Sequence, residues 1–260
     1  SGETADTIAA MKECKKRGAY VLSIVNVVGS TIAKLSDDVL YTRAGPEIAV
    51  ATTKGYTTQL AVLYLFAVYA AKVLGKIADE EYKKYISELC GLPKIMQAAI
   101  DGNKNIPELA KKYHRHRSLF FIGRNVDYAV AMEGSLKLKE ISYLHSEAYA
   151  AGELKHGTIS LIDDGHLVIA LACYEPLFEK TMSNIKEVRA RGAVVLGVAP
   201  EGNRHIFTEA DDVLFVPKVD PLFLASVEVI PLQFYAYYVA KENGCDIDKP
   251  RNLAKSVTVE

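Results

Sequence analysis

The sequence predicts an α/β protein made of two doubly wound domains with parallel sheets. Two observations lead to this fold class. Short β-branched runs alternate with longer helical stretches along the chain, and this alternation places helices on both faces of a parallel sheet. The order of elements in residues 1–76 also recurs in residues 109–245, which indicates an internal duplication.

The first half contains a helix, a strand, a short helix, a second strand and a long apolar helix. Gly18 ends the first helix, because glycine readily adopts the left-handed conformation that follows a helix. Thr52 or Thr53 is expected to cap the long helix. The five elements are expected at residues 5–17, 20–27, 31–36, 39–43 and 53–76.

A polar helical linker is expected at 77–108, with its helix interrupted at Gly91 and Pro93. Asn105 and Pro107 then open a helix that ends near residue 114. Strands follow at 118–122, 166–173, 193–199 and 212–216, and helices at 126–142, 175–191 and 221–243. The closing segment, 246–260, has no helical pattern and is either an ordered or a disordered tail, since the sequence alone favours neither.

The first half begins on a helix, whereas the second half begins on a strand. If the halves are duplicates, the first half lacks its opening strand. We therefore expect the chain to be a fragment of a longer protein, cut inside a functional loop.

Composition excludes several functional classes. The 260 residues carry a net charge of −1, so there is no basic field for nucleic acid. The longest apolar run, residues 60–71, is too short to cross a bilayer, and no secretory signal opens the chain. The four cysteines have no metal-binding spacing and are expected to be buried thiols of a cytoplasmic protein.

The loop at 1–7, Ser-Gly-Glu-Thr-Ala-Asp-Thr, is the first candidate site. Hydroxyl groups and free N–H groups at a helix N-terminus attract phosphate. Ser1 and Thr4 are therefore candidate phosphate ligands. The pattern alone favours the alternative, in which Ser1 or Thr4 is an ordinary helix cap.

Residues 133–157 form the second candidate, because titratable side chains are dense there. Lys137 and Glu140 are three residues apart and share a helix face, either as a surface ion pair or as a general base with its modulating lysine. His156 lies in a loop. We expect these groups to meet at the carboxyl end of a sheet.

Lys255 is the third candidate. A lysine near a C-terminus is usually solvated, and the pattern favours that interpretation. In the alternative, small apolar neighbours pack around the lysine, desolvate it and leave a free amine to attack a carbonyl. The basic run at 111–117 contains His-x-His without further ligands, so we interpret it as the solvated end of a helix.

Six motifs together resemble one family. They are 1–7, Ala-Gly-Pro-Glu-Ile at 44–48, Thr-Lys-Gly-Tyr-Thr-Thr-Gln at 53–59, 136–143, 147–157 and Pro-Arg-Asn-Leu-Ala-Lys-Ser-Val-Thr-Val-Glu at 250–260. Over its full length the chain resembles the isomerase part of the glucosamine-6-phosphate synthases, which contain two flavodoxin-like sugar isomerase (SIS) domains and a C-terminal tail.

The resemblance implies conversion of fructose 6-phosphate and ammonia to glucosamine 6-phosphate, in a cytoplasmic homodimer, with neither a cofactor nor a metal. A glutaminase domain elsewhere in the parent chain would supply the ammonia. The residues that match the family's catalytic positions are Glu140 for proton transfer with Lys137 assisting, His156 for ring opening in the neighbouring subunit's site, and Lys255 for the Schiff base. The matching substrate-binding residues are Ser1, Thr4, Val50, Thr52 and Ala254.

Three alternatives remain open. A non-catalytic SIS regulator would keep the phosphate loop but has no reason to keep Glu140, His156 and Lys255 together. A SIS deglycase or etherase would keep a general base but not this tail. The chain is also compatible with a folded, inactive fragment.

Overall fold

A computed structural model describes residues 1–255, so the last five residues of the predicted C-terminal tail and of the motif at 250–260 lie outside the described residues. The chain divides into two compact units. Unit 1 holds Ser1–Leu89 together with the C-terminal residues from Arg251, and unit 2 holds Cys90–Pro250. Both contain parallel sheets, which confirms the predicted α/β class.

Unit 1 is built on one parallel pair of strands, in which Leu22 is aligned with Asp38. Its core is small and centres on Met11, Val25 and Ile32. The elements are α1 (Ala5–Lys16), β1 (Leu22–Val25), α2 (Thr31–Leu35), β2 (Asp38–Tyr41) and α3 (Lys54–Val73). The predicted elements of this half are thus present, with shorter strands than expected.

The expected interruption of the polar helix was wrong, because α4 is continuous from Asp79 to Gly102 with Pro93 inside it. A proline costs a helix one hydrogen bond, and tertiary packing can offset that loss. Leu92, next to the proline, is buried. The following helix, α5 (Ile106–Tyr113), begins close to the predicted position.

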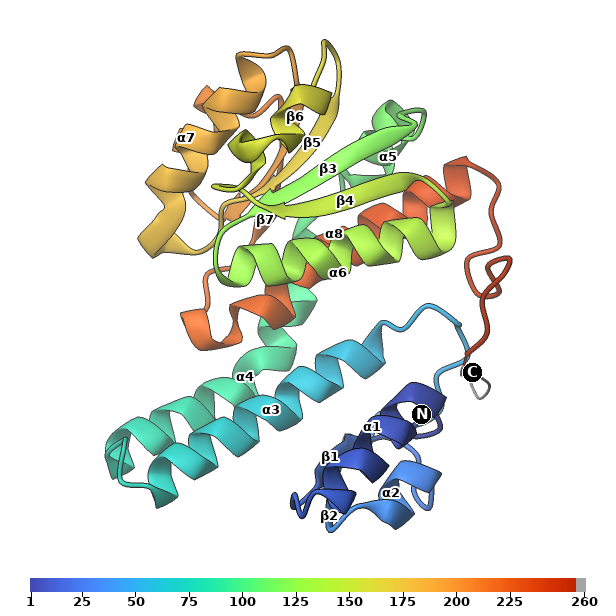
Figure 1. Ribbon diagram of the computed structural model, residues 1–260. Coiled ribbons are helices and arrows are strands. Elements are labelled where there is room, and N and C mark those ends of the chain that lie inside the picture. The colour runs from blue at the N-terminus through green and yellow to red at the C-terminus, as the bar shows by residue number, and fades with distance from the viewer. Residues whose placement is uncertain (256–260) are drawn as a thin grey trace. The chain divides into compact units, whose positions relative to one another are not determined.

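Unit 2 contains a five-stranded parallel sheet in the order β4-β3-β5-β6-β7. This is the flavodoxin-like order of a doubly wound fold. Helices α6 and α8 cover one face of the sheet and α7 covers the other (Figure 1). The elements are β3 (Ser118–Gly123), α6 (Val126–Ser142), β4 (His145–Ala150), β5 (Leu167–Leu171), α7 (Phe178–Arg189), β6 (Val194–Pro200), β7 (Asp212–Val216) and α8 (Leu224–Glu242).

Strand β4 was not predicted from the sequence. Its residues, His-Ser-Glu-Ala-Tyr-Ala, lack the continuous apolar run that reveals a central strand such as β5, in which every residue is buried. Since β4 lies at the sheet edge and, within residues 1–255, pairs only with β3, polar side chains are tolerated there. The short 3-10 turns Leu154–His156 and Thr158–Leu161 follow it.

The internal repeat is visible in the order of elements. The series α1, β1, α2, β2, α3 of unit 1 matches α7, β6, the 3-10 turn His205–Thr208, β7 and α8 of unit 2. In both series the two strands are parallel neighbours. Among the described residues, however, unit 1 has two strands where unit 2 has five, so the halves differ by more than the one expected strand.

Two further expectations need correction. Cys14 and Cys90 are exposed, so only Cys173 fits the predicted buried thiol, while Cys245 is half-buried. The segment Pro221–Glu242 is long and apolar enough to cross a membrane by length and composition, although it contains no continuous apolar run as long as residues 60–71. Most of it is buried inside unit 2, as in the core helix of a globular domain.

Candidate functional site

A cavity of about 810 Å³ opens in unit 1. Four of the predicted residues line it, namely Ser1, Thr4, Thr52 and Lys255. Val50 and Ala254 are not among its lining residues. The cavity thus joins the loop that precedes α1, the loop that precedes α3 and the C-terminal segment, three regions far apart in the sequence.

The loop that precedes α1 supplies one wall. Gly2 has a φ of +96°, and a Cβ there would lie 2.2 Å from the Ser30 hydroxyl oxygen, so only glycine fits this close approach. The Gly2 carbonyl accepts a hydrogen bond from the Ile32 N–H at 3.0 Å. Thr4 occupies the N-cap position of α1, but its side chain makes no capping hydrogen bond. The hydroxyl of Thr4 therefore does not perform the ordinary capping role.

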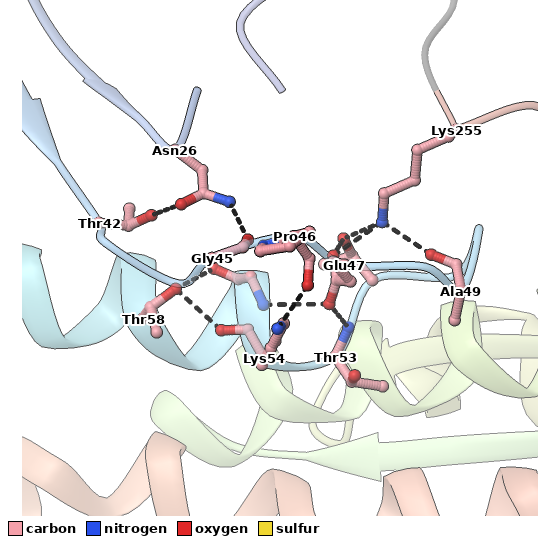
Figure 2. Close-up of polar contacts among 12 residues, drawn as sticks. Asn26, Thr42, Gly45, Pro46, Glu47, Ala49, Thr53, Lys54, Thr58 and Lys255 are labelled. Carbon is pink, nitrogen blue, oxygen red and sulfur yellow. Dashed lines mark hydrogen bonds and ion pairs between the residues drawn. The ribbon is translucent and has the colours of Figure 1, made fainter. Parts of the chain in front are cut away.

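Asn26, just after β1, organises the opposite wall. Its side-chain N–H donates to the Gly45 carbonyl at 2.8 Å, and its side-chain oxygen accepts from the Thr42 hydroxyl at 3.1 Å (Figure 2). Both partners line the cavity. The amide thus fixes the loop that leads from β2 to α3.

Glu47 caps α3, in place of the threonines expected from the sequence. Its Oε1 accepts from the N–H groups of Thr53 and Gly55 at 2.9 and 3.2 Å. The side chain of Thr53, at the N-cap position, makes no capping bond. Thr52 donates its hydroxyl to the Glu47 Oε2 at 2.6 Å. The prediction failed because the acceptor lies six residues before the N-cap residue Thr53, beyond the reach of local capping rules.

Lys255 completes this cluster. Its Nζ donates to the Glu47 Oε2 at 2.8 Å, to the Ala49 carbonyl at 2.7 Å and to the Thr52 hydroxyl at 3.5 Å (Figure 2). The lysine side chain is 36% exposed. The amine therefore has polar partners and solvent around it, as expected for a solvated lysine, and the alternative of an apolar, desolvated lysine was wrong.

These donors also determine the charge of Glu47. Burial alone would raise the pKa of this carboxyl, but hydrogen bonds from Lys255, the Thr52 hydroxyl and the two backbone N–H groups outweigh burial and lower the pKa to about 2. Glu47 is an anion at neutral pH.

In unit 2, Lys137 lies between two carboxylates on α6. Its Nζ is 2.5 Å from the Glu140 Oε2 and 3.6 Å from the Glu133 Oε1. The predicted pairing of Lys137 with Glu140 is confirmed. The surface ion-pair alternative is wrong, because Lys137 is only 4% exposed. Burial raises the pKa of Glu133, with Lys137 opposing the shift.

His156 lies at a different edge of the unit 2 sheet from Glu140. Helix α6 starts where β3 ends and runs back along the sheet, so Glu140 in its last turn lies near the amino edge (Figure 1). His156 follows β4 and lies beyond the carboxyl edge, with an exposed side chain whose Nε2 is 4.0 Å from the Glu153 Oε2. The expectation that these groups meet at the carboxyl end was wrong for Lys137 and Glu140.

Two site residues, Asn26 and Glu47, were missed by the sequence analysis, and Glu47 is the one that contacts Lys255. Glu47 lies within the Ala-Gly-Pro-Glu-Ile motif, but the sequence analysis assigned no role to the carboxylate in that motif. Its sequence signal is weak, since neither Thr52 nor Lys255 is at a helical spacing from it. Within residues 1–255, no three His, Cys, Asp or Glu side chains gather as they would around a metal ion.

The parallel sheets with helices on both faces, and a cavity beside the start of α1, define the class as a doubly wound α/β protein with a candidate anion site at a helix N-terminus. The SIS domain family model matches residues 1–69 and 112–241. The chain belongs to the SIS domain family, which confirms the predicted resemblance.

Individual proteins and solved structures similar to this chain carry more specific names than the family does. The chain is 54% identical over all 260 residues to the glutamine–fructose-6-phosphate aminotransferase (isomerizing) of Clostridium tetani, but spans 43% of that protein's length. It superposes on the C-terminal domain of glucosamine-fructose-6-phosphate aminotransferase from Francisella tularensis with a TM-score of 0.91 and 36% identity, covering 96% of this chain and 71% of that one. A glucosamine-6-phosphate deaminase from Thermotoga maritima is similar at 26% identity and a TM-score of 0.75, covering 98% of this chain and 72% of that one.

Proposed function

We propose that this chain is the sugar-phosphate isomerase part of an enzyme that makes glucosamine 6-phosphate from fructose 6-phosphate and ammonia. The main support is the cavity that joins Ser1, Thr4, Thr52 and Lys255 in a chain with 54% identity to a glutamine–fructose-6-phosphate aminotransferase. The ammonia would come from glutamine, through a glutaminase domain of the same cytoplasmic protein.

The chemistry divides among these residues. The start of α1, with Ser1 and Thr4, binds the phosphate through hydroxyls and N–H groups that lack helical partners. Lys255 attacks C2 of the open-chain ketose and forms an imine with loss of water. Ammonia then displaces the lysine amine, and Glu140 takes a proton from C1 and returns one to C2, with Lys137 beside it. Val50 and Ala254 are proposed to contact the sugar through their backbone.

His156 is proposed to open the sugar ring in the site of a neighbouring subunit. Residues 126–140 of α6 span about 20 Å at 1.5 Å per residue. Glu140 and His156 at the two edges of one sheet are therefore too far apart to act on one sugar within the same unit 2. A homodimer that exchanges His156 resolves this separation.

The imine step is tested by reduction with borohydride in the presence of fructose 6-phosphate. A single lysine, Lys255, is expected to carry the sugar phosphate, and Lys255→Ala should remove the adduct. Lys15→Ala is the matched control, because Lys15 also pairs with a carboxylate at 2.8 Å in unit 1 but does not line the cavity. An adduct on another lysine, with Lys255 unmodified, would overturn the assignment; binding without any adduct would favour a non-catalytic regulator.

The shared site is tested by mixing two inactive variants, His156→Ala and Glu140→Gln. After subunit exchange, half of the dimers are hybrids, and each hybrid has one site with both residues intact. About a quarter of wild-type activity should return. No recovery after confirmed exchange would show that His156 does not serve the neighbouring subunit.

A further inference from the structure

The carboxylate of Glu47 has two oxygens with different partners. Oε1 accepts only backbone N–H groups at the start of α3, from Thr53 and Gly55. Oε2 accepts the Thr52 hydroxyl and the Lys255 ammonium. One carboxylate therefore ties the C-terminal segment to the first turn of a helix more than 200 residues earlier in the chain.

The environment of Glu47 makes this link rigid. Its side chain is only 11% exposed, and both oxygens are held by at least two donors. Lys255 is more exposed and lies in an irregular segment, so it has no rigidity of its own. Its position in the cavity is thus determined by Glu47 and by the Ala49 carbonyl.

We infer that Glu47 is a positioning residue for the Lys255 amine, which it holds at the start of α3 where the ketose carbonyl of a bound sugar phosphate arrives. The inference rests on the proposed function, because it presumes that Lys255 forms the imine. The same carboxylate lies where it can pair with the positive charge of a protonated imine at Nζ.

A role for Glu47 as general base is disfavoured. A carboxylate with a pKa of about 2 holds a proton poorly near pH 7. Four donors already occupy its lone pairs. Removing the charge should therefore misplace the amine rather than remove a proton acceptor. Misplacement of a reacting group by about 1 Å costs about 10²-fold in rate.

The test compares wild type, Glu47→Gln, Glu47→Asp and Asp37→Asn in the full-length protein. Glutamine keeps an oxygen for the N–H groups of α3 but loses the charge that binds Lys255. Aspartate keeps the negative charge, but its side chain is one methylene group shorter, so the carboxylate lies farther from the Lys255 amine. Asp37→Asn is the matched control, because Asp37 also accepts from a lysine and from a backbone N–H, each at 2.8 Å, and does not line the cavity.

With fructose 6-phosphate and borohydride, E47Q should label Lys255 about 10²-fold more slowly than wild type. Its kcat should fall by a similar factor while KM for the sugar phosphate stays within about threefold, since the phosphate loop is untouched. E47D should fall between E47Q and wild type, and D37N should match wild type. Thermal unfolding checks that each variant is folded. If E47Q does not fold, the labelling rate of E47D decides whether Glu47 positions the amine.

Two results would overturn the inference. If wild type labels Lys255 and folded E47Q labels it equally fast, Glu47 does not position the amine, while the proposed imine stands. If wild type carries no label on Lys255, both the imine and the role of Glu47 fail.

Discussion

The two units of the chain place carboxylates at helix N-termini with opposite results. Glu47 caps α3 in unit 1, and Asp127 lies in the first turn of α6 in unit 2. The pKa of Glu47 falls to about 2 because its donors outweigh its burial. The pKa of Asp127 rises to about 7, because burial outweighs the two backbone N–H groups that it accepts, from Cys173 and Tyr174.

A neighbouring acid adds to this difference. Asp127 lies beside Glu228 of α8, and both residues are fully buried. Burial first, and then the charge of Asp127, raises the pKa of Glu228 well above its usual range, so the pair retains a proton. Glu47 thus stays charged beside a lysine and a cavity, whereas the pair Asp127 and Glu228 retains a proton inside the core of unit 2. The charge of a carboxyl depends on the supply of donors as well as on burial.

The largest effect on stability is expected from Asp127→Ala. This change leaves the N–H groups of Cys173 and Tyr174 without their acceptor, at about 1–3 kcal/mol for each buried group. Urea unfolding should show a loss of about 3 kcal/mol or more. Asp127→Asn keeps an oxygen acceptor and should cost about 1 kcal/mol at most. Equal losses in both variants would show that the carboxyl proton, rather than the acceptor, stabilises the fold.

The next effect is a dependence of stability on pH. The folded-state pKa of Asp127, about 7, lies above its unfolded value of 3.8, so the folded protein binds the extra proton between these values. Stability therefore falls as pH rises from about 4 to 7, by about 1.4 kcal/mol per pH unit while the two states differ by one proton. Between pH 5 and 8 we expect wild type to lose about 2.5–3 kcal/mol through this group.

Asp127→Asn is the variant that isolates this slope in urea titrations at pH 5 and pH 8. Its free energy of unfolding should depend less on pH than that of wild type. Glu47 should add no slope in this range. Its lowered pKa contributes stability above its usual value of 4.5, which is lost only as the pH falls towards 2. An unchanged slope in the Asp127 variant would assign the dependence to other acids.

The sequence predicts those features of the fold and of the candidate site that depend on short residue spacings or on apolar runs. The alternation of strands and helices was sufficient for the fold class, and the three-residue spacing of Lys137 and Glu140 was sufficient for their ion pair. Strand β4 was missed because an edge strand needs no apolar run. The bond between Glu47 and Lys255 was missed because it joins residues 208 positions apart, and no local pattern encodes such a contact.

The smallest change in stability is expected from Gly55→Ala. The same glycine-to-alanine change in unit 2 allows the two units to be compared. A Cβ at Gly55 would lie 3.1 Å from the Glu47 Oε2 and 3.3 Å from the Thr52 hydroxyl oxygen. Gly55→Ala gains about 0.5–1 kcal/mol of helix propensity, which offsets this crowding, so stability should change by less than about 1 kcal/mol.

The labelling of Lys255 in Gly55→Ala should change more than its stability. The added methyl group displaces the Glu47 carboxylate and with it the Lys255 amine, so borohydride labelling should slow by about tenfold. Gly134→Ala is the counterpart in unit 2, where a Cβ would lie 2.7 Å from a Leu232 methyl carbon and 3.2 Å from the Phe121 ring. There the crowding is between packed side chains and should cost about 1–3 kcal/mol. Labelling of Lys255 should be preserved in folded Gly134→Ala. If Gly55→Ala lost stability but kept full labelling, Glu47 would be a structural cap, and the contrast between a functional Glu47 and the structural pair Asp127 and Glu228 would disappear.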